Sequence, residues 1–410
     1  MKKNVRYGVL FLIIFCIAGI IEAGLWRNAT KIQTTLSVSP TISAFPDKYN
    51  NSFVQGGYVY LYDGDGGWND VTPSGAIPNG SSARQTVNAA LFSDQNTGWV
   101  VSVPDNSDSP SFFKVYRTTD GGGSWLSANV SVDWCGGVDM DFIDANNGWL
   151  LVHTGVACGS EGVSVMRTTD GGASWSTVSM TGLSGTPGCI EFAGDKTGIR
   201  FYDANNGWVT GVIATGGIYL YVTRDGGQNW QEQDIPTPGA PVSGTGLGAT
   251  YAYYQAYPPV FYPNGHGVLP ISEAYCATSD NSFLGGMMYF YETDNSGADW
   301  ILSSRITMPS ITDGAISPLY CFLPNGKGYF TNGFALYSVA SAKGRWNETV
   351  FNVPLSVIGS LYGPSKMIFT DENTGWLIPG GENDSFLLKS TDEGQYWSAI
   401  QSYAYEGVHK

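Results

Sequence analysis

One eight-residue phrase recurs along this chain of 410 residues and constrains its fold more than any other feature. Full copies, in which Asn295 replaces one aspartate, are TTDGGGSW at Thr118–Trp125, TTDGGASW at Thr168–Trp175, TRDGGQNW at Thr223–Trp230, TDNSGADW at Thr293–Trp300 and STDEGQYW at Ser390–Trp397. Degenerate copies end at Trp68 and Trp346. A spacing of about 50 residues is typical of one long domain built from repeated units.

A second phrase lies between the copies of the first. It reads FSDQNTGW at Phe92–Trp99, FIDANNGW at Phe142–Trp149, YDANNGW at Tyr202–Trp208 and FTDENTGW at Phe369–Trp376. Gly and Asn tolerate positive φ, so each Asn/Gly cluster between apolar runs predicts a hairpin turn. Two hairpins per repeat give four antiparallel strands.

Composition agrees with an all-β chain. The chain contains 54 Gly, and 14% of its residues are aromatic, which favours turns and strands over helices. Units of this size cannot bury both of their faces alone, so neighbours must stack around a ring. We therefore predict a seven-bladed β-propeller of four-stranded antiparallel blades, with six blades as the alternative. A strand at 398–404 is expected to complete the blade that begins with the Trp68 hairpin.

The N-terminus has the composition of a targeting segment. Basic Met1–Arg6 precedes an apolar run from Gly8 to Ile21, which is short for a membrane span. We predict a signal peptide or an N-terminal membrane anchor at 1–23, a leading segment at 24–52, and a single propeller domain at 53–410. The protein is then secreted or extracytoplasmic, with the N-terminal segment as its only tether to a membrane.

Charge and cysteine content narrow the partners. A net charge of −15 repels phosphate backbones, so we expect no nucleic acid partner. Three histidines and the absence of a C-x-x-C pair predict no metal site and no cofactor. In an exported chain, Cys135 and Cys158 are our favoured disulfide. We expect a monomer.

The repeated phrase has a structural explanation. Its aspartate is placed to accept N–H groups within a turn, and its tryptophan to cover the hairpin with apolar area. We therefore assign no catalytic role to any member of this set, which comprises Asp120, Trp125, Asp170, Trp175, Asp225, Trp230, Asn295, Trp300, Asp392 and Trp397.

These phrases resemble the Asp box, the repeat of bacterial neuraminidases. Their pairing with the D-x-x-x-GW phrase is most similar to the photosystem II stability and assembly factor family and its relatives in non-photosynthetic bacteria. That resemblance implies a seven-bladed, exported binding scaffold. Sialidases with Asp boxes carry an F/Y-R-I-P phrase, whereas the nearest string here is SRIT at Ser304–Thr307.

Candidate ligand contacts follow from the expected blade geometry. If the GW phrase joins strands one and two and the Asp box joins strands three and four, both turns lie on one face. The loops between strands two and three and the connectors between blades then share the opposite face, the long-loop face, where binding residues concentrate. There we place a tyrosine cluster and four carboxylates: Tyr251, Tyr253, Tyr254, Tyr257, Asp139, Asp141, Glu191 and Glu273.

Two functions fit these observations. The first is a non-enzymatic propeller that binds a protein or a glycan through its long-loop face. The alternative is a carbohydrate-active enzyme, similar to the Asp-box sialidases or xyloglucanases. With no complete catalytic motif in the chain, we predict that the protein is not an enzyme.

Overall fold

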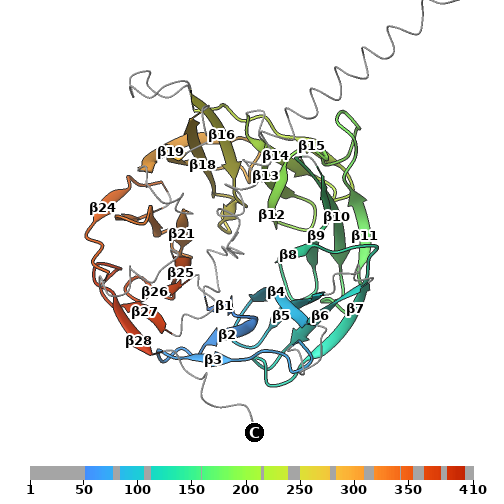
Figure 1. Ribbon diagram of the computed structural model, residues 1–410, viewed down its shortest axis with the longest axis horizontal. Coiled ribbons are helices and arrows are strands. Elements are labelled where there is room, and N and C mark those ends of the chain that lie inside the picture. Colours follow the sequence, from blue (N-terminus) through green and yellow to red (C-terminus); the bar gives the residue numbers. More distant parts are fainter. Residues whose placement is uncertain are drawn as a thin grey trace, which may run out of the picture.

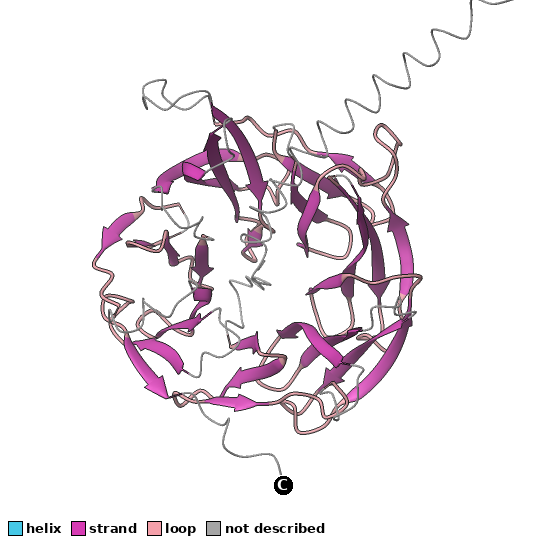
Figure 2. Cartoon of the chain, viewed as in Figure 1, coloured by secondary structure: helices cyan, strands magenta, loops and turns pink. Residues whose placement is uncertain are grey.

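The protein is a β-propeller (Figure 1). The computed structural model describes residues 51–76, 84–105, 112–157, 159–213, 217–238, 250–277, 283–308, 318–341, 343–353, 364–379 and 386–401. Every regular element in these ranges is a β-strand (Figure 2). The strands form antiparallel sheets that stand side by side around a common centre. The predicted all-β propeller is thus confirmed.

The first half of the ring contains three sheets of consecutive strands. The first sheet has three strands, β1 (Ser52–Gln55), β2 (Tyr58–Tyr62) and β3 (Trp68–Asp70). The second contains β4 (Arg84–Phe92), β5 (Gly98–Asp105), β6 (Phe112–Thr118) and β7 (Leu126–Ser131). The third contains β8 (Gly137–Phe142), β9 (Gly148–Ala157), β10 (Ser160–Thr168) and β11 (Ser176–Met180).

The next sheet has nine strands in two groups. The two groups are joined by a single residue pair, Val212↔Gln255. One group is β12 (Asp195–Phe201), β13 (Gly207–Val212), β14 (Tyr219–Thr223) and β15 (Trp230–Glu232). The other is β16 (Thr250–Ala256), β17 (Val260–Phe261), β18 (Gly267–Ala277), β19 (Phe283–Thr293) and β20 (Ile301–Met308).

Two four-stranded sheets complete the chain. One contains β21 (Leu319–Phe322), β22 (Gly328–Thr331), β23 (Leu336–Val339) and β24 (Asn347–Thr349). The other contains β25 (Pro364–Phe369), β26 (Gly375–Pro379), β27 (Phe386–Ser390) and β28 (Ser398–Gln401). The first strand of each sheet faces the centre of the ring (Figure 1), and β4 contacts β1 on one side and β8 on the other.

The two phrases occupy the predicted turns. In the second sheet, the GW phrase connects β4 to β5 and the Asp box connects β6 to β7. Both turns therefore lie at the same end of the sheet, which we call the Asp-box face. The opposite ends of the strands form the long-loop face, where β8 begins and where β9 passes into β10.

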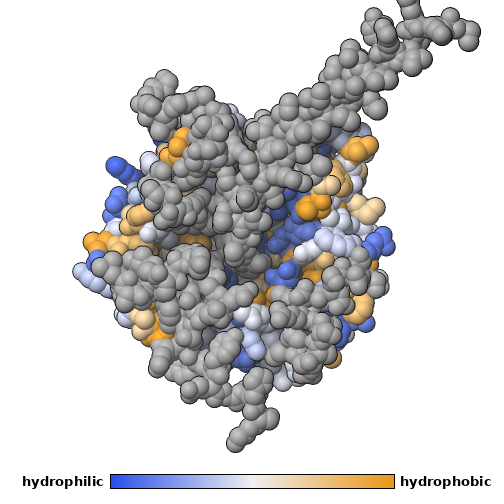
Figure 3. Space-filling view, viewed as in Figure 1, coloured by the Kyte–Doolittle hydropathy of each residue, from blue (hydrophilic) through white to orange (hydrophobic). Residues whose placement is uncertain are grey.

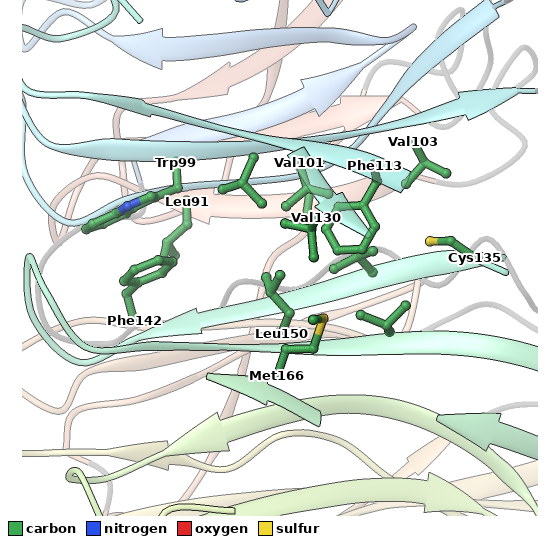
Figure 4. Close-up of a cluster of buried hydrophobic side chains, with 14 residues drawn as sticks. Leu91, Trp99, Val101, Val103, Phe113, Val130, Cys135, Phe142, Leu150 and Met166 are labelled. Carbon is green, nitrogen blue, oxygen red and sulfur yellow. The ribbon is translucent and has the colours of Figure 1, made fainter. Parts of the chain in front are cut away.

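Aromatic stacking connects several neighbouring sheets. Trp99 from the second sheet lies flat on Phe142 from the third, with ring centroids 3.8 Å apart (Figure 4). The same contact recurs between Trp149 and Phe201 at 3.7 Å. The indole nitrogen of Trp99 also donates to the carbonyl oxygen of Gly171, in the Asp box of the next sheet. The GW tryptophan thus holds neighbouring sheets together, which its sequence position did not reveal.

The ring closes between its first and last sheets. Trp68 packs edge-on against Trp376, with centroids 5.4 Å apart, and Phe53 joins the same apolar cluster. Lys366 Nζ donates to the carbonyl oxygen of Ser52 at 2.8 Å. The predicted shared blade is wrong, because β28 pairs with β27 as the fourth strand of the last sheet.

Some predictions remain open. The first sheet has three strands within the described ranges, so the count of seven blades, with six as the alternative, stays a prediction. The predicted signal or anchor at 1–23 and most of the segment at 24–52 lie outside the described residues. Within the described part of the chain, no helix has the length and hydropathy needed to cross a membrane.

Candidate functional site

The Asp-box aspartates form hydrogen bonds within their own turns. Asp170 Oδ1 accepts the backbone N–H of Ser174 at 2.9 Å and the Thr168 hydroxyl at 2.7 Å, while Oδ2 accepts the Ser174 hydroxyl. These bonds, led by the Ser174 hydroxyl, lower the pKa of Asp170 to about 2. Asn295 Oδ1 accepts the equivalent donors from Thr293 and Asp299. Both carboxylate oxygens of such a residue are engaged with the turn.

The Asp-box tryptophans pack against the first strand of their own sheet. Trp125, Trp175 and Trp230 contact Phe92, Phe142 and Phe201 edge to face, with ring planes 80° to 86° apart. Trp300 and Trp397 are likewise buried. These contacts place the aromatic side chains of the motif in packing positions, so any ligand site must be sought elsewhere.

A charged cluster lies toward the long-loop face of the third sheet. His153, on β9, donates from Nε2 to Asp139 Oδ2 at 3.0 Å and from Nδ1 to Glu161 Oε1 at 2.7 Å. Burial lowers the pKa of His153, but its bonds to the two carboxylates outweigh that effect and raise it to about 10. The imidazole is therefore a cation at neutral pH, which explains why both of its nitrogens donate.

Glu161 is fully engaged on its other side. Its Oε2 accepts the backbone N–H of Lys196 at 2.6 Å, and Lys196 Nζ donates to the carbonyl oxygen of Glu161 at 2.9 Å. The same ammonium donates to the carbonyl oxygens of Phe192, Ala193 and Gly194. Desolvation lowers the pKa of Lys196 to about 8, against the opposing charge of Glu161. Lys196 thus fastens the connector before β12 to the third sheet.

Asp139 differs from its neighbours because it reaches solvent. Its side chain is 26% exposed, whereas those of Glu161 and Asp141 are 10% and 0% exposed. Asp141, two residues along β8, forms a buried ion pair with Arg200 at 3.0 Å and accepts the N–H of Phe201. Asp139 and Asp141 therefore share one face of β8, but only Asp139 is available to a ligand.

Two exposed aromatic side chains lie beside this cluster. Trp134 precedes β8 and is 37% exposed, and Phe192 precedes β12 and is 38% exposed. Sequence reasoning missed both, as well as His153 and Glu161. The sequence feature that could have indicated them is the set of glycines at 136, 137, 155 and 162 near these residues. Hydrophilic residues gather to the right of the centre in Figure 3, where Figure 1 places β8 and β12.

The predicted tyrosine cluster does not form one platform. Tyr254 packs in the cluster between the β12–β15 group and the β16–β20 group, together with Tyr289. Tyr257 is buried on the other side of the β16–β20 group, with its ring 5.9 Å from that of Tyr320. Tyr253 is partly buried, and the side chain of Tyr251 lies outside the described residues. Alternation along β16 explains the separation, since successive side chains point to opposite faces.

The remaining predicted carboxylates are separate from Asp139. Glu273 is only 1% exposed, and its Oε2 accepts the hydroxyls of Tyr275 at 2.7 Å and Tyr289 at 2.5 Å. Its partner Tyr289 belongs to the cluster that joins the two groups of the nine-stranded sheet, one junction further round the ring. Glu191 Oε1 accepts the Ser184 hydroxyl and the Gly185 N–H within the connector that follows β11.

The cysteines and metal ligands give no further site. Cys135 is a buried thiol whose pKa burial raises to about 11, and its Sγ donates to the carbonyl oxygen of Gly137. Cys158 lies outside the described residues, so the favoured disulfide stays a prediction. No group of three or more potential metal ligands occurs in the described part of the chain.

Comparisons with known proteins give structural matches only. No family model and no curated protein matches the chain. An α-L-arabinofuranosidase from Fusarium graminearum is 15% identical, over 77% of this chain and 93% of that one, with a TM-score of 0.44. An ulvan lyase is 8% identical over 87% and 83%, with a TM-score of 0.37. A Trypanosoma rangeli sialidase is 13% identical over 71% and 48%, with a TM-score of 0.36.

At these identities the similarity extends to the fold alone. The resemblance to the photosystem II assembly factor family is not shown, because no model of any family matches. Our prediction that the chain is not an enzyme is wrong in its reasoning. It took the repeats, the N-terminal signal and the lack of a catalytic motif to exclude activity, whereas propellers with a similar fold are named as carbohydrate-acting enzymes, so this fold does not exclude activity.

Proposed function

We propose that this protein cleaves a carbohydrate at the long-loop face of its third sheet, with Asp139 as the anionic group of the reaction. One observation supports the proposal most directly: Asp139 is a solvent-reaching carboxylate that the partly buried His153 imidazole holds in place at 3.0 Å. Cleavage of a glycosidic bond develops positive charge on the sugar ring. A fixed, ionised carboxylate stabilises that charge, either directly or as a nucleophile.

His153 and Glu161 support Asp139 without contacting the substrate. Glu161 uses one carboxylate oxygen for His153 and the other for the backbone N–H of Lys196. His153 in turn uses both nitrogens. This chain of bonds fixes the orientation of the carboxylate before substrate binds, which is the arrangement that electrostatic catalysis requires.

The arginine content favours an uncharged sugar as substrate. Among the arginines whose side chains the structure describes, Arg200 alone is on an innermost strand, where it is paired with Asp141. Recognition of a sugar carboxylate depends on arginine forks that are free to form two parallel bonds. The sialidase-like form of our original alternative is therefore less well supported than a hydrolase of neutral glycans. The basic and apolar residues at 1–23 support export to where such polysaccharides lie.

The test is hydrolysis by the purified protein. Neutral oligosaccharides and aryl glycosides of arabinose, xylose, glucose and galactose are incubated with the wild type, and reducing ends are measured. Asp139→Asn should lower kcat at least 1,000-fold, which corresponds to a rise of about 4 kcal/mol in the activation free energy. Glu348→Gln is the control, because it removes the charge of an exposed carboxylate on the outer strand β24, and it should leave kcat unchanged. Equal rates for wild type and Asp139→Asn, with folding verified by circular dichroism, would exclude this role.

A further inference from the structure

We infer that Trp134 forms a stacking subsite for an uncharged sugar residue next to Asp139. The inference rests on the proposed function, because it adds a binding position to the same site. It concerns a residue that none of the repeated motifs contains and that lies in the connector between β7 and β8.

The indole ring of Trp134 lies on the glycine backbone. A Cβ atom on Gly136 would be 2.5 Å from Cη2 of Trp134, so only glycine at this position lets the ring lie where it does. A Cβ atom on Gly155 would be 4.0 Å from Cε3 and Cζ3 of the same ring. Since Trp134 is still 37% exposed, the ring packs on glycines and remains accessible to a ligand.

Strand register places this ring on the side of the proposed site. Gly155 follows His153 by two residues on β9, with a β-bulge between them, since Val163 pairs with His153 and Gly162 with Gly155. Gly137 is paired with His153, and Asp139 follows Gly137 by two residues on β8. Gly136 also donates its N–H to the carbonyl oxygen of His153 at 2.8 Å. Trp134 therefore covers the hairpin end from which His153 reaches Asp139.

The chemistry of the surface fits a neutral sugar. The C–H groups of a sugar ring pack against a flat aromatic face, and its hydroxyls donate to nearby carboxylates. Asp139 is partly exposed and Asp133, next to Trp134, is exposed. The neighbouring cations already have partners: His153 contacts two carboxylates, and the three N–H groups of Lys196 point among four carbonyl oxygens within hydrogen-bond distance. Among the side chains that the structure describes here, an acidic sugar would meet the carboxylates without a free cation.

Preorganisation supports binding at this position. Trp134 presents a large area at a low entropic cost, because the glycine backbone beneath it limits where the ring can go. Phe192 offers a second exposed ring from the connector on the other side of the third sheet, where it packs 3.1 Å from a Cβ position on Gly162. Gly162 is paired with Gly155, so both aromatic residues lie near the same end of the β9/β10 hairpin.

The binding test separates this inference from the hydrolysis assay. Arabinohexaose, xylohexaose and cellohexaose are titrated by calorimetry into Asp139→Asn, which prevents turnover, and into the wild type over short times. At least one probe should bind saturably. Trp134→Ala in the same background should weaken its binding at least tenfold. Gly136→Ala keeps the indole but displaces it, and should weaken binding by a smaller factor.

Controls make each outcome decisive. Tyr396→Ala removes an aromatic side chain that is more exposed, at 62%, from the Asp-box face and should leave binding unchanged. Oligogalacturonate, an anionic probe, should not bind. Unchanged binding by Trp134→Ala, binding of oligogalacturonate as tight as that of the neutral probes, or no binding of any probe would overturn the inference. Binding that depends on Trp134 without any hydrolysis would instead uphold the subsite and remove the proposed cleavage.

Discussion

The charge of His153 depends on the folded structure. Its side chain is 18% exposed and touches two carboxylates, and its pKa rises to about 10 despite the cost of burial. In an unfolded chain the pKa would return to about 6.5. The folded state therefore holds a proton that the unfolded state releases between these two pH values.

This difference predicts how stability varies with pH. A raised folded-state pKa stabilises the protein fully below pH 6.5, and that contribution is lost as pH rises toward about 10. The loss from one proton is at most about 1.4 kcal/mol per pH unit. Urea denaturation of wild type and His153→Gln at pH 6, 8 and 10 should show their stability difference shrinking as pH rises.

Deprotonation of Lys196 changes the stability in the opposite direction, so its effect must be separated from that of His153. Its pKa falls to about 8 when folded, so the unfolded state binds more protons between pH 8 and 10.5 and stability rises there. His153→Gln retains Lys196, and the subtraction removes most of this effect. A stability difference that stays constant from pH 6 to 10 would contradict the assigned charge of His153. Titration of the His153 ring by NMR gives the pKa directly.

At the scale of the single turn, the Asp box depends on hydrogen-bond acceptors more than on charge. Asp225 Oδ1 accepts the N–H groups of Gln228 and Asn229 and the hydroxyl of Thr223. An asparagine provides the same acceptor, as Asn295 does in the turn between β19 and β20. The turn geometry should therefore survive loss of the charge.

A pair of substitutions tests this explanation. Asp225→Ala removes the acceptor and should lower the free energy of unfolding by about 1–2 kcal/mol. Asp225→Asn keeps the Oδ1 acceptor and loses only the bond from Asn229 Nδ2 to Oδ2, so it should cost less than Asp225→Ala, about 0.5 kcal/mol. Thermal and urea unfolding measure both. Equal costs for the two variants would mean that the charge, and not the hydrogen bonds, stabilises the turn.

These turns explain what the sequence could and could not predict. The hairpins follow from local chemistry, since Asp170 accepts hydrogen bonds from Thr168 and Ser174 within its own turn. The position of β28 does not, because strand pairing at the ring closure depends on which edge is free. The candidate site is also non-local: Asp139, His153 and Glu161 come from three strands, and Trp134 is recognisable only once Gly136 and Gly155 lie beneath it.

Across the whole molecule, the junction between the first and last sheets differs from every other described junction. Consecutive sheets elsewhere are held near each other by a chain connection, whereas β1–β3 and β25–β28 meet from opposite ends of the described chain. Trp68, Trp376 and Phe53 supply much of the apolar contact there, and Lys366 adds one hydrogen bond to Ser52. Within the described residues, this junction therefore depends on side-chain contacts, without a short loop to keep the two sheets together.

Trp68→Ala should open this junction locally. The loss of a buried tryptophan costs about 3–5 kcal/mol. Trp300→Ala is the matched control, since Trp300 ends the same phrase, is also buried, and contacts Trp208 edge to face as Trp68 contacts Trp376. In hydrogen exchange, Trp68→Ala should speed exchange in β1–β3 and β25–β28 more than elsewhere, because these sheets can separate while the rest of the ring stays folded. Trp300→Ala should speed exchange across the whole propeller, because the sheets beside Trp300 remain connected by the chain. Identical exchange patterns in the two variants would contradict local opening and show that the ring unfolds as one unit.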